Sequence, residues 1–169
     1  MDLLADYRAN KDEYFATNPN SPLPPSQRAD FGGLEYFPTD PGLVFTVPVV
    51  PGDREPVTIA TSDGAERTYY RAGTVRMTIA GEPVDLTLFD TGHPGFFLPF
   101  RDATSGRESY GAGRYMDLHP NPDGTVTIDF NFAYNPFCAY TDRFSCALPP
   151  HENWLAVPIR AGERAYSPR

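Results

Sequence analysis

The residues best suited to chemistry lie in the last third of the chain, between positions 100 and 163. This segment holds both cysteines, Cys138 and Cys146, and two of the three histidines, set among glycines and prolines. A thiol becomes a nucleophile when a neighbouring base takes its proton, and His151 is close to Cys146 along the chain. The same cysteines could instead form a disulfide or pack as small buried side chains. The sequence leaves these alternatives open.

We expect no metal and no cofactor at these positions. A tetrahedral zinc site takes four ligands, whereas Cys138, Cys146 and His151 supply three. Neither C-x2-C nor H-x3-H spacing occurs in the chain. Pro149 and Pro150 also stiffen the link between Cys146 and His151, so closeness in sequence does not imply contact.

Carboxylates of the same segment are the candidates for acid–base catalysis. Glu108, Asp129 or Glu152 could act as a general base in an enzyme of hydrolase type, and Cys138 is the alternative nucleophile. No spacing pairs two of these carboxylates on one face, and neither a nucleophile elbow nor an HExxH motif is present. Whether the protein is an enzyme stays open.

Binding of a small polar or anionic molecule is the function that this segment favours. A guanidinium offers forked donors to a carboxylate or phosphate, and tyrosine combines a broad ring with a polar tip. We predict that residues 105–115, 129–140 and 146–153 form one pocket. The candidate ligand-binding residues are Arg101, Ser105, Tyr110, Arg114, Asp129, Asn131, Asn135 and Tyr140.

Several of these residues also have purely structural interpretations. Gly113 and its neighbours could aim backbone amides at an anion beside Arg114, or Arg114 could pair with Asp102 or Asp129 in an ordinary glycine-rich turn. Asp129 and Asn131 would share one face of a strand, which is either solvated or part of a pocket. Asn153 is expected to hydrogen-bond nearby backbone. A scaffold that uses the aromatic residues of 132–140 is a further alternative.

Length and charge limit the classes of partner. The 169 residues fit one domain, comprising an N-terminal helix and a β domain over 34–166. The 14 basic and 22 acidic residues give a net charge of −8, which disfavours nucleic acids and anionic membranes as partners. The N-terminus shows no signal-peptide pattern and no segment is apolar enough to span a bilayer, so we expect a cytoplasmic, acidic protein. The oligomeric state is not predicted.

The elements that must position these residues are mainly β-strands. Apolar spacing predicts a helix over residues 2–16, ended by Asn18-Pro19 and followed by a short turn after Pro25. Asp63-Gly64 is typical of a hairpin turn. About nine short antiparallel strands predict a barrel, roll or sandwich. Alternating or β-rich segments lie at 43–47, 57–61, 66–71, 75–79, 84–88, 96–100, 113–118, 125–132 and 154–160.

Three segments carry a resemblance to a known family. TSGRESYGAGRYMDL, IDFNFAYNPFCAY with CALPPHEN, and PIRAGER are similar to the motifs of the domain of unknown function 1684 family. The resemblance continues upstream in LEYFP and ATSDG, and so covers nearly the whole chain. Residues 89–91 depart from the family pattern, which leaves the loop at 89–95 in doubt as part of a shared site. The resemblance implies no activity.

Overall fold

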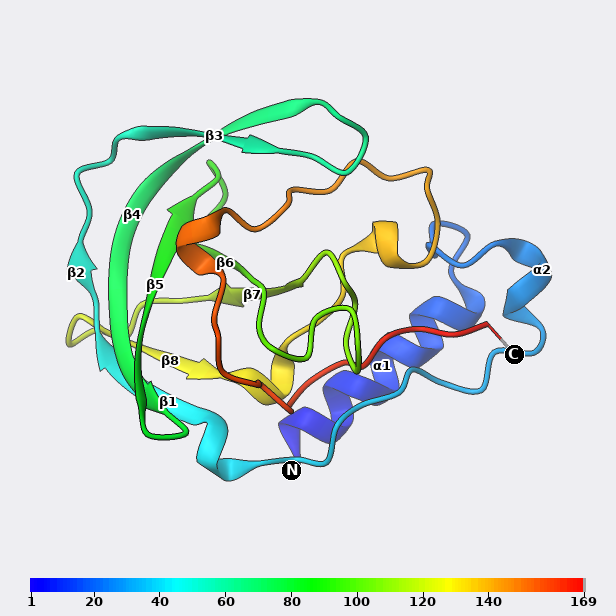
Figure 1. Ribbon diagram of the computed structural model, residues 1–169. Coiled ribbons are helices and arrows are strands. Elements are labelled where there is room, and N and C mark those ends of the chain that lie inside the picture. Colours follow the sequence, from blue (N-terminus) through cyan, green and yellow to red (C-terminus); the bar gives the residue numbers. More distant parts are fainter. Residues whose placement is uncertain (169) are drawn as a thin grey trace.

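The computed structural model describes residues 1–168 and is mainly antiparallel β-sheet, with one long helix at the N-terminus (Figure 1). The helices are α1 (Leu3–Thr17) and α2 (Pro25–Arg28). Four short 3-10 helices are η1 (Pro41–Leu43), η2 (Phe130–Phe132), η3 (Phe137–Ala139) and η4 (His151–Asn153). The eight strands of the described residues are β1 (Val44–Pro48), β2 (Val50–Pro51), β3 (Pro56–Ala60), β4 (Glu66–Ile79), β5 (Glu82–Asp90), β6 (Phe96–Phe100), β7 (Arg114–Leu118) and β8 (Thr125–Asp129).

Helix α1 confirms the predicted N-terminal helix. It begins where the Asp2 carboxylate accepts hydrogen bonds from the amides of Leu4 and Ala5, both at 3.1 Å. It ends before Pro19, which cannot continue a helix. The helix docks through Phe15, which is buried and meets the ring of Tyr140 edge-on at 4.9 Å. Helix α1 and the C-terminal tail run side by side at one end of the molecule (Figure 1).

The larger sheet has the order β2-β4-β5-β6-β7, with β3 also pairing with β4. Two segments expected as separate strands, at 66–71 and 75–79, join in the single long strand β4. A bulge between Arg71 and Gly73 lets β4 continue through this junction and changes which side chains face the core. The predicted hairpin between β3 and β4 is confirmed, with Gly64 at a φ of +84°.

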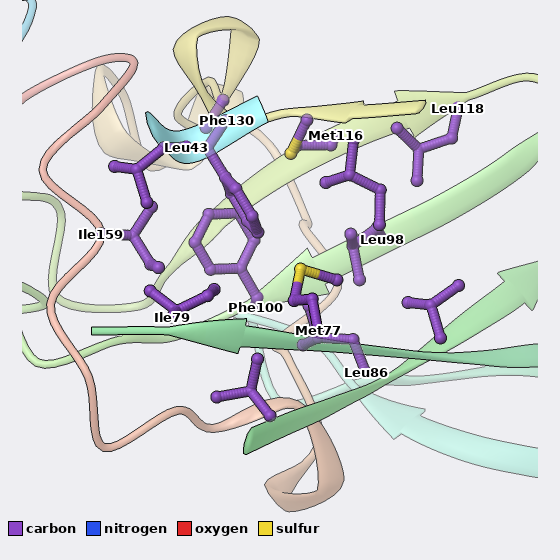
Figure 2. Close-up of a cluster of buried hydrophobic side chains, with 14 of the residues drawn as sticks. Leu43, Met77, Ile79, Leu86, Leu98, Phe100, Met116, Leu118, Phe130 and Ile159 are labelled. Atoms are coloured by element: carbon purple, nitrogen blue, oxygen red, sulfur yellow. The ribbon is translucent and has the colours of Figure 1, made fainter. Parts of the chain in front are cut away.

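The main core lies between this sheet and the smaller sheet formed by β1 and β8. Met77, Leu86, Leu98 and Phe100 point into it from the larger sheet, and Phe130 covers it from just beyond β8 (Figure 2). The two sheets face each other as in a sandwich and do not close into a barrel. The prediction of a mainly β fold is therefore confirmed, and of the alternatives a sandwich-like arrangement is observed.

Two predictions for the C-terminal half were wrong in detail. Residues 154–160, expected to be a strand, form no strand, and the strand expected over 125–132 ends at Asp129. Asp129 instead caps the 3-10 turn η2 by accepting from the Asn131 amide at 2.9 Å. In residues 1–168, no helix has the length and apolar character needed to cross a membrane.

Candidate functional site

Arg114 lies in the interior, where its side chain has no exposed surface. Its guanidinium donates to the carbonyl oxygens of Ile159 at 2.8 Å, Ala161, and Glu163 at 3.1 Å. It also faces Asp102 at 3.5 Å. The structure therefore favours the structural interpretation of Arg114, as an ion pair with Asp102, over the anion-binding one. Carbonyl groups of the C-terminal tail, and not a ligand, therefore accept hydrogen bonds from the Arg114 guanidinium.

Asp102 and Ser105 belong to the same interior network. The Asp102 carboxylate accepts from the Ile159 amide, from Thr104 Oγ1 at 2.9 Å and from Ser105 Oγ at 3.2 Å. The Ser105 hydroxyl in turn accepts from the Asp102 amide at 3.1 Å. Ser105 thus stabilises the turn that follows β6.

The predicted pair Asp129 and Asn131 is not on a shared strand face. Asn131 is buried, and its amide nitrogen donates to Asp129 Oδ1 at 2.8 Å and to the carbonyl of Asp40 at 3.0 Å. Its oxygen accepts from the Asp40 amide at 2.9 Å. These bonds fasten the chain before β1 to the end of β8. Both the nitrogen and the oxygen of the Asn131 side-chain amide therefore have partners within the protein.

Asn135 and Tyr140 meet around a buried carboxylate, that of Glu163. Glu163 accepts from the Asn135 amide at 2.7 Å and from the Tyr140 hydroxyl at 2.9 Å, and it forms an ion pair with Lys11 of α1. Burial, with the nearby Glu163 charge as the second cause, raises the pKa of Tyr140. This cluster joins the N-terminal helix to the C-terminal tail.

The candidate catalytic carboxylates and Arg101 are engaged at separate places on the surface. Glu108 pairs with Arg160 at 3.0 Å. Glu152 pairs with Arg71 at 2.9 Å, and this hydrogen-bonded arginine lowers the pKa of the Glu152 carboxyl. The guanidinium of Arg101 lies 4.3 Å from the ring of Trp154. A lowered pKa makes Glu152 a weak base, and it lies outside the cleft described next.

Tyr110, Cys138 and Cys146 do come together. The Tyr110 hydroxyl lies 3.6 Å from Cys138 Sγ, and the Cys138 amide donates to Cys146 Sγ at 3.4 Å. His151 instead stacks on Trp154, with 3.7 Å between ring centroids, so the structure does not support the cysteine–histidine alternative that the sequence left open. Within residues 1–168, no three His, Cys, Asp or Glu side chains gather as a metal site would require.

A cleft of about 560 Å³ lies on the face of the larger sheet opposite the main core. Side chains of β4, β6 and β7 form its floor. The loop 91–95 and the segment 145–147 form walls. An antiparallel bridge from Ala147 to Thr61 fixes the 145–147 wall to the β3–β4 hairpin. The loop 91–95 therefore borders the cleft. It begins at the end of residues 89–91, which depart from the motifs of the family that the chain resembles.

The floor of the cleft is a row of four aromatic rings. Phe97 meets Tyr115 edge-on at 4.7 Å and Tyr69 at 5.8 Å, and Tyr115 meets Tyr134 at 5.9 Å. Alternation along β6 and β7 places the rings of Phe97 and Tyr115 on one face, because their neighbours Leu98 and Met116 point into the core. The row offers a broad apolar surface with polar hydroxyl tips.

A cation and an anion lie at the two ends of this row. Arg67 is at the Tyr69 end, where it donates to the carbonyl of Ser145 and where a hydrogen bond with Tyr69 raises its pKa. Asp117 is at the Tyr134 end and accepts from the Tyr134 hydroxyl at 2.6 Å. Burial, followed by this bond, raises the pKa of Tyr134, so the hydroxyl stays protonated at neutral pH.

Each of the three segments predicted to form a pocket contributes to this cleft, through Tyr115, Tyr134 and Cys146 with its neighbour Ala147. None of the eight predicted ligand-binding residues lines it. The residues that sequence reasoning missed are Arg67, Tyr69, Phe97 and Asp117. For Asp117 the available signal was the alternation in RYMDL, where Tyr115 and Asp117 occupy the positions between the buried residues Arg114, Met116 and Leu118. The neighbours of Arg67 and Tyr69 are exposed, so no comparable signal marked those two residues.

Comparisons with known proteins agree with the resemblance seen in the motifs. Residues 29–164 match a family described as "Protein of unknown function (DUF1684)". A solution NMR structure of an uncharacterized protein from Haloarcula marismortui is 43% identical, with a TM-score of 0.74; the match covers 95% of this chain and 91% of that one. No curated protein matches the chain.

Proposed function

We propose a function from the cleft itself, because the chain belongs to the DUF1684 family, whose description assigns no activity. The proposed function is binding of a small ring-bearing molecule that carries an acidic group. The observation that carries this proposal is the aromatic floor from Tyr69 to Tyr134, with Arg67 at one end and Asp117 at the other.

The size and chemistry of the cleft support a ligand. Small-molecule sites commonly enclose about 300–1,000 Å³ and combine apolar walls with a few polar groups. The cleft of about 560 Å³ falls in this range. Half-buried Phe97 and buried Tyr115 present ring surface to it. Their rings are already braced against one another, so little side-chain entropy would be lost on binding.

The charges at the two ends define the class of ligand. Arg67 favours a carboxylate or phosphate, because a guanidinium presents forked donors. Asp117 accepts hydrogen bonds and therefore favours a hydroxyl or amino group at the opposite end of the ligand. The ring would lie between them over Phe97 and Tyr115. Hydroxybenzoates, hexuronic acids and nucleoside monophosphates fit this description.

A thermal-shift titration with these three compound classes tests the proposal, with acetate and benzyl alcohol as controls that lack the ring or the acid. At a concentration one hundred times Kd, a ligand adds about 2.7 kcal/mol to the stability, which for a chain of this size raises Tm by roughly 5–11 °C. The expected result is a saturable rise for at least one ring-bearing acid.

Arg67→Gln is the informative variant, and Arg76→Gln is its matched control. Arg76 lies on the same strand, is exposed and pairs with Asp85 at 2.6 Å, away from the cleft. Loss of a charged hydrogen bond of about 1.5–3 kcal/mol weakens binding roughly 10- to 100-fold in Arg67→Gln. The proposal fails if no compound raises Tm, or if both variants respond like the parent protein.

A further inference from the structure

The two cysteines form a close pair at the back of the 145–147 wall. The Cys138 amide donates to Cys146 Sγ at 3.4 Å, and the Cys146 thiol hydrogen-bonds Cys138. Both thiols are free in this structure. The two side chains come from η3 and from the irregular segment before the Pro149-Pro150 pair, eight positions apart in sequence.

Separate contacts hold each cysteine in place. Cys146 is fixed to the β3–β4 hairpin, because its amide donates to Ser62 Oγ at 3.0 Å and its carbonyl accepts from the Ser62 amide at 2.9 Å. Cys138 lies in the 3-10 turn and has the Tyr110 hydroxyl 3.6 Å from its sulfur. These contacts hold the two cysteines next to each other, with Cys146 Sγ 3.4 Å from the Cys138 amide nitrogen.

The surroundings of the pair make the two thiols unequal. The hydrogen bond from Cys146 is the main cause that lowers the pKa of Cys138 to about 6; burial opposes it, and Tyr110 and Ser62 support it. Donation to Cys138 raises the pKa of Cys146. Burial also raises the pKa of Tyr110, which stays a protonated donor at neutral pH. The positive charge of Arg67 lies near Cys146 and partly opposes the rise in the pKa of that thiol.

The two cysteines also differ in their exposure to solvent. Cys138 is partly exposed, whereas Cys146 is buried. Reactive redox thiols combine thiolate character with access to solvent, and often have a second cysteine nearby. Cys138 has these properties and Cys146 is the nearby partner.

We propose that Cys138 and Cys146 are a peroxide-reactive thiol pair, in which Cys138 is oxidised first and Cys146 resolves it to a disulfide. The Cys138 thiolate attacks one peroxide oxygen; an S–O bond forms, the O–O bond breaks, and the departing hydroxide takes a proton to become water. The Cys146 sulfur then attacks Cys138 sulfur, so that an S–S bond forms and the S–O bond breaks. The hydroxyl leaves as a second water with the Cys146 proton, and two electrons pass from the thiols to the peroxide.

Peroxide treatment of the reduced, folded protein followed by intact-mass and peptide analysis tests this proposal. The expected product is about 2 Da lighter through loss of two hydrogens, and carries a Cys138–Cys146 crosslink. The proposal is overturned if peroxide leaves both cysteines reduced in the folded protein but oxidises them once the protein is unfolded. Conversion of Cys138 to sulfinic acid without a crosslink also overturns it.

Two serine variants assign the order of events. In Cys146→Ser the sulfenic acid on Cys138 cannot be resolved, so dimedone traps it as an adduct. In Cys138→Ser, peroxide consumption slows to the rate of an ordinary buried thiol. Equal rates in the two variants contradict the assigned order. Circular dichroism checks that both variants remain folded.

Tyr110→Phe tests the role of its hydroxyl as a positioning group, with Tyr70→Phe as the control at an exposed tyrosine. The expected result is a several-fold slower reaction of Cys138 at pH 7 and an upward shift in its pH profile, with no change in the control. No ligand of the cleft enters these measurements, so their outcome is independent of the proposed binding function.

Discussion

Replacing Arg114 should destabilise the protein more than any other single change to the predicted site. Arg114→Met keeps much of the length and removes the charge. The substitution leaves Asp102 buried without its cation, and leaves the carbonyl groups of Ile159, Ala161 and Glu163 without a donor. Because these groups lie where the side chain has no exposed surface, solvent replaces the lost bonds only if the tail moves away.

The size of the effect follows from the buried position. Removing one partner of a buried ion pair costs about 3–5 kcal/mol, because a charge stays buried without compensation. Each buried acceptor left without a donor adds roughly 1–3 kcal/mol, unless the tail loosens enough to admit water. Because loosening of the tail admits water to the three carbonyls, we take about 1 kcal/mol for them together and expect a total loss of about 4–6 kcal/mol. This loss is equivalent to a fall in Tm of roughly 8–24 °C for a chain of this size.

Urea denaturation followed by circular dichroism, together with thermal melting, measures this loss. Arg107→Met is the matched control, because Arg107 is an exposed arginine of the loop that leads into β7. Arg114→Lys retains the charge without the forked geometry, and is expected to lie between the parent protein and Arg114→Met. If Arg114→Met melts within a few degrees of Arg107→Met, the interior network does not have the structural role assigned to it.

Three further predictions follow from buried contacts. Asn153→Ala should cost about 2–4 kcal/mol in urea titration, because its amide makes three buried bonds to the backbones of Thr87 and Pro99; an unchanged midpoint would contradict this. Gly113→Ala should lower Tm, because Gly113 has a φ of +101° and an added Cβ would lie 2.5 Å from a backbone oxygen. Alkylation of Cys138 should rise with pH around a midpoint of about 6, since the protonated thiol is unreactive; a midpoint near the ordinary value of about 8.5 would show that its pKa is not lowered.

The regular elements were predictable because their signals are local. Apolar spacing and Asn18-Pro19 located α1, and alternation located the strands around the hairpin at Gly64. The joining of two predicted strands into β4 was not predictable, since the bulge at Arg71/Gly73 depends on pairing with β5. Whether the sheets close into a barrel likewise depends on long-range pairing that no local pattern encodes.

The site was predictable only as a region. Polar residue types identified the three segments that reach the cleft, but not which side chains face it. Arg114 and Tyr115 illustrate the reason, because adjacent residues of a strand point to opposite faces. Arg114 faces the interior, whereas Tyr115 faces the cleft. Which face is solvated depends on the packing of the tail, and that contact is far away in sequence.

The missing strand at 154–160 explains why so many polar side chains of this region are buried. A chain without ladder partners still has backbone donors and acceptors that must be satisfied when it is buried. Here side chains satisfy them: Arg114 donates to three tail carbonyls and Asp102 accepts from the Ile159 amide. Glu163 accepts from the Asn135 amide, and the Asn135 side chain donates to the carbonyl of Arg164 at 2.9 Å. The residue types that suggested a ligand thus bind the protein's own irregular backbone, and none of these side chains lines the cleft on the aromatic face of the larger sheet.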